Sequence, residues 1–117
     1  MEAIKDKAMA AAGTFLERKG FEILERGWAH GDASVDYIAR DEGDLVFVTC
    51  LVGENNGTGF PKEEIDRKAN ERLAIAYLAE HPESGDCTVR FDTVSLVIVS
   101  DSRALLRHHR NALCAVE

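Results

Sequence analysis

The sequence predicts an α/β fold, in which helices flank a central β-sheet. Apolar residues recur at helical spacing over residues 3–18 and again from 61 to about 80. Between these segments, strand-forming residues flank a two-residue turn at Glu42-Gly43, which is typical of a β-hairpin. Both faces of the hairpin strands carry apolar side chains, which indicates a sheet that is covered on both sides.

The expected elements are a helix, three strands, a second helix and further strands. The first helix ends at Gly20, because glycine readily adopts the left-handed conformation that terminates helices. Pro61 suits the first turn of the second helix, which His81-Pro82 ends. The three strands are expected over 21–28, 33–39 and 45–51, with a break at Gly31-Asp32 and a flexible glycine-rich connection over 53–59.

The C-terminal part of the chain predicts more strand. Residues 88–100 contain the apolar residues of one long strand or of a strand pair. The segment from Asp101 is ambiguous, because Asp101 and Ser102 could cap a helix.

Length and composition fit a single domain over residues 1–117. The chain has 45% hydrophobic and 30% charged residues, which are the values of a globular protein. No apolar run approaches the ~20 residues that a membrane helix needs, and the N-terminus lacks the apolar segment of a signal peptide. The three cysteines, Cys50, Cys87 and Cys114, form no Cys-x-x-Cys pair and are typical of reduced thiols. We therefore expect a cytoplasmic protein with no membrane partner.

The net charge of −7 argues against an extended phosphate-binding surface, because nucleic-acid affinity comes largely from lysine and arginine contacts. An acidic protein can still carry a local basic patch. The sequence has four basic groups. In the first three, acids lie between or beside the basic residues, as on a solvated helix face with salt pairs, whereas the fourth has no such acids. The groups are Lys5/Lys7, Arg18/Lys19/Arg26, Arg67/Lys68/Arg72 and Arg103/Arg107/Arg110.

The hairpin brings three residues onto one face. With a two-residue turn, Arg40 faces Leu45, Ile38 faces Phe47 and Asp36 faces Thr49. Directly opposed residues hold their Cβ atoms roughly 4.5–5.5 Å apart. Residues 36, 49 and 51 then share the layout of an acid, an acid and a lysine around a divalent cation. Only the first of these is present, because position 49 is a threonine and position 51 a leucine.

This hairpin and its flanks resemble the YraN-like family of small bacterial proteins, over nearly the whole chain. The resemblance implies the restriction-endonuclease-like fold, with helices on both sides of a central mixed β-sheet that starts with three antiparallel strands. It also implies a PD-(D/E)XK-type motif and, from Asp101, a short strand followed by a short helix. The matching segments are 16–21 (Leu-x-x-x-Gly-Phe), 23–29 (Ile-Leu-Glu-Arg-x-Trp), 33–39, 45–51, Lys68 and Arg90-Phe91-Asp92.

The departures from the family gather at its metal site. One glutamate of the family falls on Thr49 and its lysine falls on Leu51, whereas Asp36 is retained. Two further glutamates fall on Ser34 and Met9, two arginines fall on Ala29 and Gly53, and Trp28 and Lys68 are retained.

These departures remove the groups that nuclease chemistry needs. Mg²⁺ is usually held by one or two carboxylates, and it activates a water and offsets charge on the phosphate. Leu51 can neither position that water nor carry charge. We interpret the chain as a fold that is retained without its catalytic centre, so it is expected to be no enzyme and to need no cofactor. The vestigial candidates are Asp36, Thr49, Leu51 and Lys68, of which Asp36 is the one candidate metal ligand.

Three hypotheses remain open at this stage. The first is a non-catalytic domain that binds DNA or RNA weakly, or a protein partner. The second is an active nuclease that uses Mg²⁺ or Mn²⁺ on migrated ligands. The third is a purely structural or regulatory module, such as a homodimer formed through an open sheet edge. The migrated ligands of the second hypothesis would be Asp32, Asp36, Glu54 or Lys68.

Several of these residues also have structural interpretations. Asp36 can be a half-buried carboxylate that is bonded to hydroxyls or to the backbone. Trp28 can anchor the sheet to a helix, although it could also stack on a base. His108 and His109 are adjacent, so they do not share a face and do not predict a two-histidine metal site. Cys50 points away from Thr49, which argues against a nucleophile beside Asp36.

Overall fold

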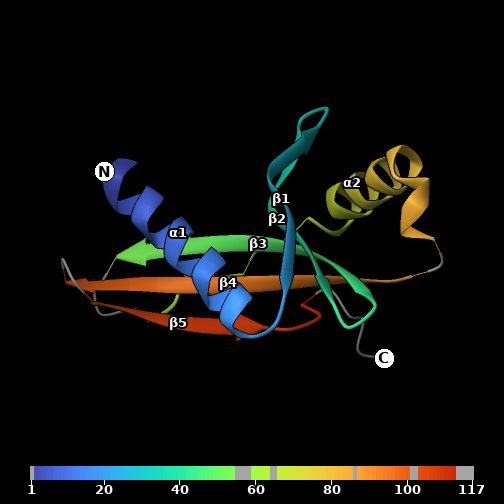
Figure 1. Ribbon diagram of the computed structural model, residues 1–117. Helices are drawn as coiled ribbons and strands as arrows, with labels where there is room; N and C mark the ends of the chain where they lie inside the picture. The colour runs from blue at the N-terminus through green and yellow to red at the C-terminus, as the bar shows by residue number, and fades with distance from the viewer. Residues whose placement is uncertain (1, 55–58, 64–65, 86, 101–102, 113–117) are drawn as a thin grey trace, which may run out of the picture.

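The computed structural model has an α/β fold in which a five-stranded mixed sheet lies between two helices, as the sequence predicts (Figure 1). The structure describes residues 2–54, 59–63, 66–85, 87–100 and 103–112. Its elements are α1 (Glu2–Arg18), β1 (Glu22–His30), β2 (Ala33–Asp41), β3 (Asp44–Glu54), α2 (Arg67–Glu80), the short 3₁₀ helix η1 (Pro82–Ser84), β4 (Thr88–Ser100) and β5 (Arg103–His109).

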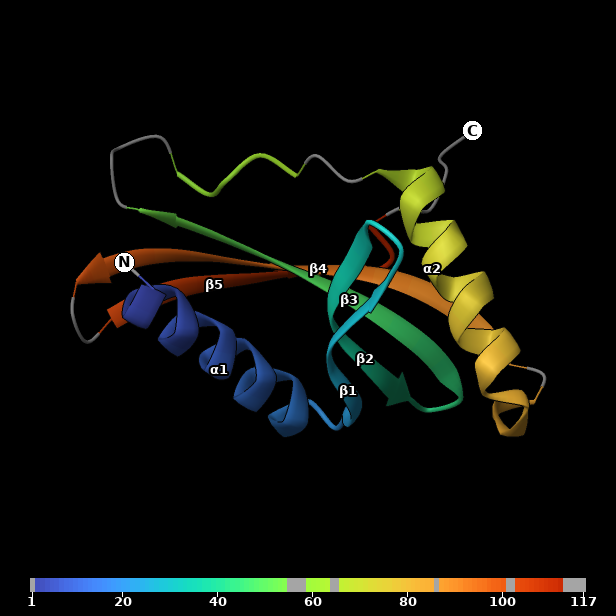
Figure 2. The ribbon, with the colours of Figure 1, turned by 90° about the horizontal axis from the view of Figure 1, so that it is seen from above.

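The strands follow one another across the sheet in the order β1-β2-β3-β4-β5. The first three strands pair antiparallel, β3 pairs parallel with β4, and β5 returns antiparallel to β4. A parallel pair needs a crossover connection, and here the crossover contains α2. Viewed from above, α1 lies on one face of the sheet and α2 on the other (Figure 2). This arrangement, consistent with a nuclease-like fold, explains why both faces of the strands are apolar.

The hairpin of β2 and β3 has the register that the sequence predicts. Ile38 pairs with Phe47, and Arg40 pairs with Leu45. Both residues of the turn have positive φ, 56° for Glu42 and 112° for Gly43. Two-residue hairpin turns of type I′ require this conformation at both positions, so the local sequence sets the register of the hairpin.

Each face of the sheet has its own apolar core. Burying one large apolar side chain contributes about 1.5–3 kcal/mol, so these two cores provide much of the driving force for folding. In the described part of the chain, no helix is both long and apolar enough to span a membrane. The α1-side core contains Ala8, Ala12, Leu16, Phe21, Tyr37, Ala39, Val46, Val48, Val94 and Leu96. The α2-side core contains Val35, Ile38, Leu45, Phe47, Leu73, Ala74 and Tyr77.

The second helix begins at Arg67 and not at Pro61, so that prediction is wrong. Asp66 is the N-cap, and its side chain accepts a hydrogen bond from the N–H of Ala69 at 3.1 Å. An aspartate can satisfy a free N–H group of the first helical turn in this way, whereas a proline cannot. Pro61 instead packs on β3, where a Cβ atom added at Gly53 would lie 3.2 Å from its ring.

The C-terminal segment is a strand. β4 is a single long strand, and β5 pairs along it, which settles the ambiguity between helix and strand. The proposed helix cap at residues 101–102 lies outside the described residues, as do residues 55–58 of the predicted glycine-rich connection. The short helix implied after β5 is a turn at 110–112 as far as the structure describes it.

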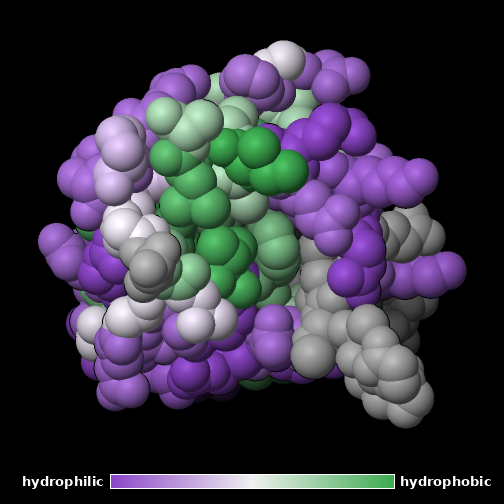
Figure 3. Space-filling view, turned by 90° about the vertical axis from the view of Figure 1, so that its right-hand side faces the viewer, coloured by the Kyte–Doolittle hydropathy of each residue, from purple (hydrophilic) through white to green (hydrophobic). Residues whose placement is uncertain are grey.

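The side of the molecule seen in Figure 3 carries an apolar patch that is bordered by polar side chains. Ile75 of α2 is 68% exposed. It lines a groove between α2 and the turn that joins β1 to β2, together with His30 and Asp32. Trp28 holds this turn against the helix, since its ring meets the ring of Tyr77 edge-on at 5.2 Å. The anchoring role considered for Trp28 is therefore present.

Candidate functional site

Two rows of side chains cross β3, β4 and β5 on one face of the sheet. Within each row the residues are direct neighbours in the strand register, so their Cβ atoms lie about 5 Å apart. We call these rows the first rung and the second rung. The first rung consists of Thr49, Thr93 and His109, and the second rung consists of Leu51, Ser95 and Arg107.

Both rungs face the α2 side of the sheet. Phe47 precedes Thr49 by two residues and packs in the α2-side core. Because side chains alternate between the faces of a strand, Thr49 and Leu51 lie on that side too. Cys50 packs against the α1-side core instead. Burial, followed by the negative charge of Asp36, raises the pKa of the Cys50 thiol to about 12, which leaves it protonated and a poor nucleophile.

Asp36 lies where β2 separates from β3. The paired ladder ends at Tyr37 and Val48, one residue short of the predicted pair between Asp36 and Thr49. Beyond the ladder, Oδ2 of Asp36 accepts a hydrogen bond from the backbone N–H of Cys50 at 2.6 Å. The structure therefore places Asp36 beside the strand that carries Thr49 and Leu51, with its carboxylate bonded to the backbone of that strand.

A segment that we call the strap, residues 59–63, crosses the sheet on the same face as the rungs. Pro61 of the strap lies against Gly53, which follows Leu51 by two residues and faces the same side. Farther across the sheet, the guanidinium of Arg107 lies over the ring of Phe60 at 4.6 Å. The family resemblance places an arginine at position 53, and Pro61 occupies the space that such a side chain would need.

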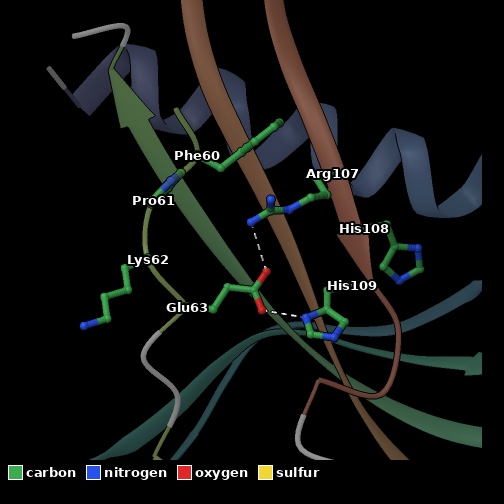
Figure 4. Close-up of a pocket in the computed structure, with 7 residues that line it drawn as sticks. All are labelled: Phe60, Pro61, Lys62, Glu63, Arg107, His108 and His109. Atoms are coloured by element: carbon green, nitrogen blue, oxygen red, sulfur yellow. Dashed lines mark hydrogen bonds and ion pairs between the residues drawn. The ribbon is translucent and has the colours of Figure 1, made fainter. Parts of the chain in front are cut away.

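Glu63 of the strap bridges the outer ends of the two rungs. Its Oε2 lies 3.4 Å from Nη2 of Arg107, and its Oε1 lies 2.6 Å from Nδ1 of His109. Figure 4 shows both side chains directed at the carboxylate, while Lys62 and His108 point away from it. These contacts close one side of a pocket of about 600 Å³ between the strap and β5. The Glu63 side chain is only 18% exposed, whereas both of its basic partners are 50% exposed.

The middle of each rung is a buried hydroxyl. Thr93 and Ser95 are both 0% exposed. Among the described residues, neither Oγ1 of Thr93 nor Oγ of Ser95 has a hydrogen-bond partner. A buried hydroxyl without a partner costs about 1–3 kcal/mol, so two in one place indicate a site with unused hydrogen-bonding capacity.

The remaining predicted site residues are not gathered at the rungs. Lys68 is exposed on the first turn of α2. Asp32 lines the groove beside Ile75, in the turn at the end of β1. Glu54 is the last residue of β3, and its side chain lies outside what the structure describes.

The residues at the motif positions do not fit a divalent cation. Mg²⁺ and Mn²⁺ prefer carboxylate and carbonyl oxygens. Thr49 offers one neutral hydroxyl, Leu51 offers no ligand, and the carboxylate of Asp36 already accepts the N–H of Cys50. Across the described residues, no group of three or more histidine, cysteine, aspartate or glutamate side chains is placed to hold a metal ion.

A separate network on the α1 side fixes the position of β5. Asp92 of β4 is fully buried and binds Arg90, His108 and the backbone N–H of Asn111. Burial alone would raise the pKa of Asp92, but hydrogen bonds from His108, Arg90 and Asn111 outweigh it and lower the pKa to about 2. Because His108 joins this network while His109 faces Glu63, the two histidines point to opposite faces, as predicted.

The same network explains the Arg90-Phe91-Asp92 motif. The guanidinium of Arg90 also binds Asp41 and Asp44, which flank the turn of the β2–β3 hairpin, at 3.0 Å each. The motif thus ties the hairpin turn to β4 and β5, and its role is structural.

Sequence reasoning missed Glu63, Thr93 and Ser95. Thr93 and Ser95 could have been noticed in the sequence, because they alternate with Val94 and Leu96 in the apolar second half of β4. No local pattern marks Glu63, because its partner His109 lies 46 residues away along the chain.

Comparison with known protein sequences finds relatives that match most of the chain. Residues 9–96 match the sequence model of a family described as "Uncharacterised protein family UPF0102". A UPF0102 protein of Beutenbergia cavernae is 34% identical over 112 residues, which cover 93% of this chain and 94% of that protein. One of Parafrankia sp. is 36% identical over 86% of this chain and 87% of its own length. One of Frankia alni is 40% identical over 71% of each chain.

Proposed function

We propose that this chain, which belongs to the uncharacterised protein family UPF0102, binds nucleic acid through its endonuclease-like fold without cleaving it. UPF0102 is the YraN-like family that the sequence motifs resemble. By this resemblance, the acid and the lysine of the motif correspond to Thr49 and Leu51 of β3, at the inner ends of the two rungs.

The basic character of β5 and of the turn that follows it carries the proposal. Residues 103–111 contain three arginines, two histidines and no acid, in a chain whose net charge is −7. Arg107, His109 and Arg110 each expose half or slightly more of their side chains. Exposed arginines on one sheet edge can contact successive phosphates, and the release of counterions then favours binding.

The absence of cleavage in this proposal follows from the motif positions. A nuclease of this fold needs a metal-bound water near the phosphate and a positive charge beside it. Leu51 supplies no charge, and Asp36 binds the backbone of β3. A nucleic acid bound along β5 would therefore contact side chains that can bind a phosphate but cannot activate a water for its hydrolysis.

Binding is tested by fluorescence anisotropy with labelled single- and double-stranded DNA and RNA oligonucleotides, at several salt concentrations. We expect affinity to fall with rising salt, and Arg107→Ala to reduce the slope of log K against log salt by about 1. Arg18→Ala is the matched control, because Arg18 is an exposed arginine at the end of α1, on the opposite face. Binding that is absent, or that Arg18→Ala weakens as much as Arg107→Ala, would contradict the proposal.

Cleavage is tested with the same oligonucleotides in Mg²⁺ and in Mn²⁺. We expect intact substrate in both. Metal-dependent cleavage that Asp36→Ala abolishes would favour the alternative function, an active nuclease with migrated ligands.

The exposed edge of the sheet supports a second candidate function, a homodimer. β5 ends the sheet order within the described residues, and Leu105 on it is 55% exposed. An unpaired edge strand with an exposed leucine can pair with a second copy. Sedimentation velocity tests this candidate, and a monomer at high micromolar concentration would exclude it.

A further inference from the structure

The carboxylate of Glu63 has the environment of a bound anion. The guanidinium of Arg107 lies 3.4 Å from one carboxylate oxygen, and the imidazole of His109 lies 2.6 Å from the other. The ring of Phe60 lies under the same guanidinium at 4.6 Å and limits its orientations. Arginine and histidine side chains that converge on one carboxylate also match the charge and the acceptor geometry of a phosphate.

The neighbouring strand β4 carries two hydroxyl donors that the carboxylate does not use. Thr93 is the direct neighbour of His109 in the strand register, and Ser95 is the direct neighbour of Arg107. Their hydroxyls are fully buried, and neither has a partner among the residues that the structure describes. A carboxylate has two oxygens, and both are in contact with the basic pair. A phosphate has more oxygens and can accept from additional donors.

We propose that Arg107 and His109 form a binding site for a phosphate group of nucleic acid, and that Glu63 fills this site in the free protein as an internal competitor. Thr93 and Ser95 donate to the phosphate once it has replaced the carboxylate. This inference rests on the proposed function and adds its regulation: the strap must release β5 before the backbone of a nucleic acid can bind there.

The experiment compares inorganic phosphate binding to wild type, Glu63→Gln and Glu63→Gln/Arg107→Gln, by calorimetry and by the shifts of β5 amide signals in NMR spectra. Glu63→Gln removes the competing charge while keeping a similar shape. We expect it to bind phosphate about tenfold more tightly than wild type, since it removes the charged competitor that the phosphate must displace from Arg107 and His109. The double variant is expected to lose this gain.

Glu17→Gln is the matched control. Glu17 also forms an ion pair with an arginine, Arg26, at 3.3 Å, and it lies on α1, away from the strap. The two single variants have the same net charge, so a general charge effect would raise phosphate affinity equally in both. Equal affinities of Glu63→Gln and Glu17→Gln for phosphate would overturn the inference.

A second experiment leaves Glu63 unchanged and substitutes Arg107 alone. Arg107→Gln in otherwise wild-type protein is expected to lower oligonucleotide affinity about tenfold, because it removes a phosphate contact. Unchanged affinity would also overturn the inference, provided that thermal unfolding shows the variant to be folded.

The oligonucleotide measurements separate the inference from the proposed function. If Glu63→Gln gains phosphate affinity while no variant binds an oligonucleotide, the anion site stands and the nucleic-acid function fails. If wild type binds oligonucleotides but Glu63→Gln binds them no more tightly than Glu17→Gln, the function stands and the role of Glu63 fails.

Discussion

The carboxylate of Asp36 accepts a hydrogen bond from the backbone N–H of Cys50 at 2.6 Å, at the point where the pairing of β2 and β3 ends. The bond replaces a main-chain bond that the diverging strands no longer make. By the family resemblance, the same carboxylate would hold a metal ion together with an acid and a lysine on β3. Here those two positions are Thr49 and Leu51, and the remaining acid supports the strand.

We expect Asp36→Ala to lower the free energy of unfolding by about 1–2 kcal/mol, because the N–H of Cys50 loses a charged acceptor that water only partly replaces. Asp36→Asn keeps an acceptor oxygen and is expected to cost less. Urea unfolding followed by circular dichroism measures both variants. If Asp36→Ala unfolds at the same urea concentration as wild type, the bond has no structural role.

The network around Asp92 predicts a loss of stability in acid. The pKa of Asp92 is about 2 in the folded state and about 3.9 in an unfolded chain. A lowered carboxyl pKa stabilises the fold above the unfolded value, and this contribution disappears as the pH falls from about 4 to about 2. Asp92→Asn is expected to lose about 3 kcal/mol at neutral pH, because it removes the buried carboxylate that binds both Arg90 and His108.

Urea unfolding as a function of pH measures this effect. The difference in stability between wild type and Asp92→Asn is expected to be constant above about pH 4 and to shrink below it. A difference that stays constant down to pH 2 would show that Asp92 does not ionise in the way described.

A close contact between α1 and β2 predicts non-additive substitutions. The hydroxyl of Tyr37 donates a hydrogen bond to the carbonyl oxygen of Met9 at 2.6 Å. A Cβ atom added at Gly13 would lie 2.7 Å from that hydroxyl. We expect Gly13→Ala to cost about 1–3 kcal/mol through this clash and Tyr37→Phe to cost about 1 kcal/mol through the lost hydrogen bond.

The double variant lacks the hydroxyl that the added methyl group approaches most closely, so its cost is expected to be smaller than the sum of the single costs. A double-mutant cycle by urea unfolding tests this expectation. Strict additivity would mean that α1 shifts to accommodate the added methyl group, and that the contact does not fix the position of the helix.

Local signals explain which parts of the fold could be predicted from the sequence. The β2–β3 hairpin was predictable because its register depends on two adjacent residues, Glu42 and Gly43, that adopt positive φ. The start of α2 was predicted wrongly because Pro61 and Asp66 both suit the start of a helix. The choice between them depends on the packing of Pro61 against Gly53, a contact that no local pattern shows.

The candidate site was predictable only in its inner half. Asp36, Thr49 and Leu51 lie on one hairpin, so the turn alone is enough to predict that they lie near one another. The outer half depends on β5 and the strap, which lie far apart along the chain and meet through the ion pairs of Glu63. The segment that became β5 was ambiguous, because its strand conformation depends on the long neighbouring strand β4.

Titrating Mn²⁺ into wild type and into Asp36→Ala by calorimetry tests whether the protein keeps the fold without a metal centre. We predict no saturable heat for either protein, because positions 49 and 51 provide a threonine and a leucine, and the carboxylate of Asp36 already binds the N–H of Cys50. Saturable micromolar binding to wild type that disappears in Asp36→Ala would show that a metal site remains, and it would favour an active nuclease.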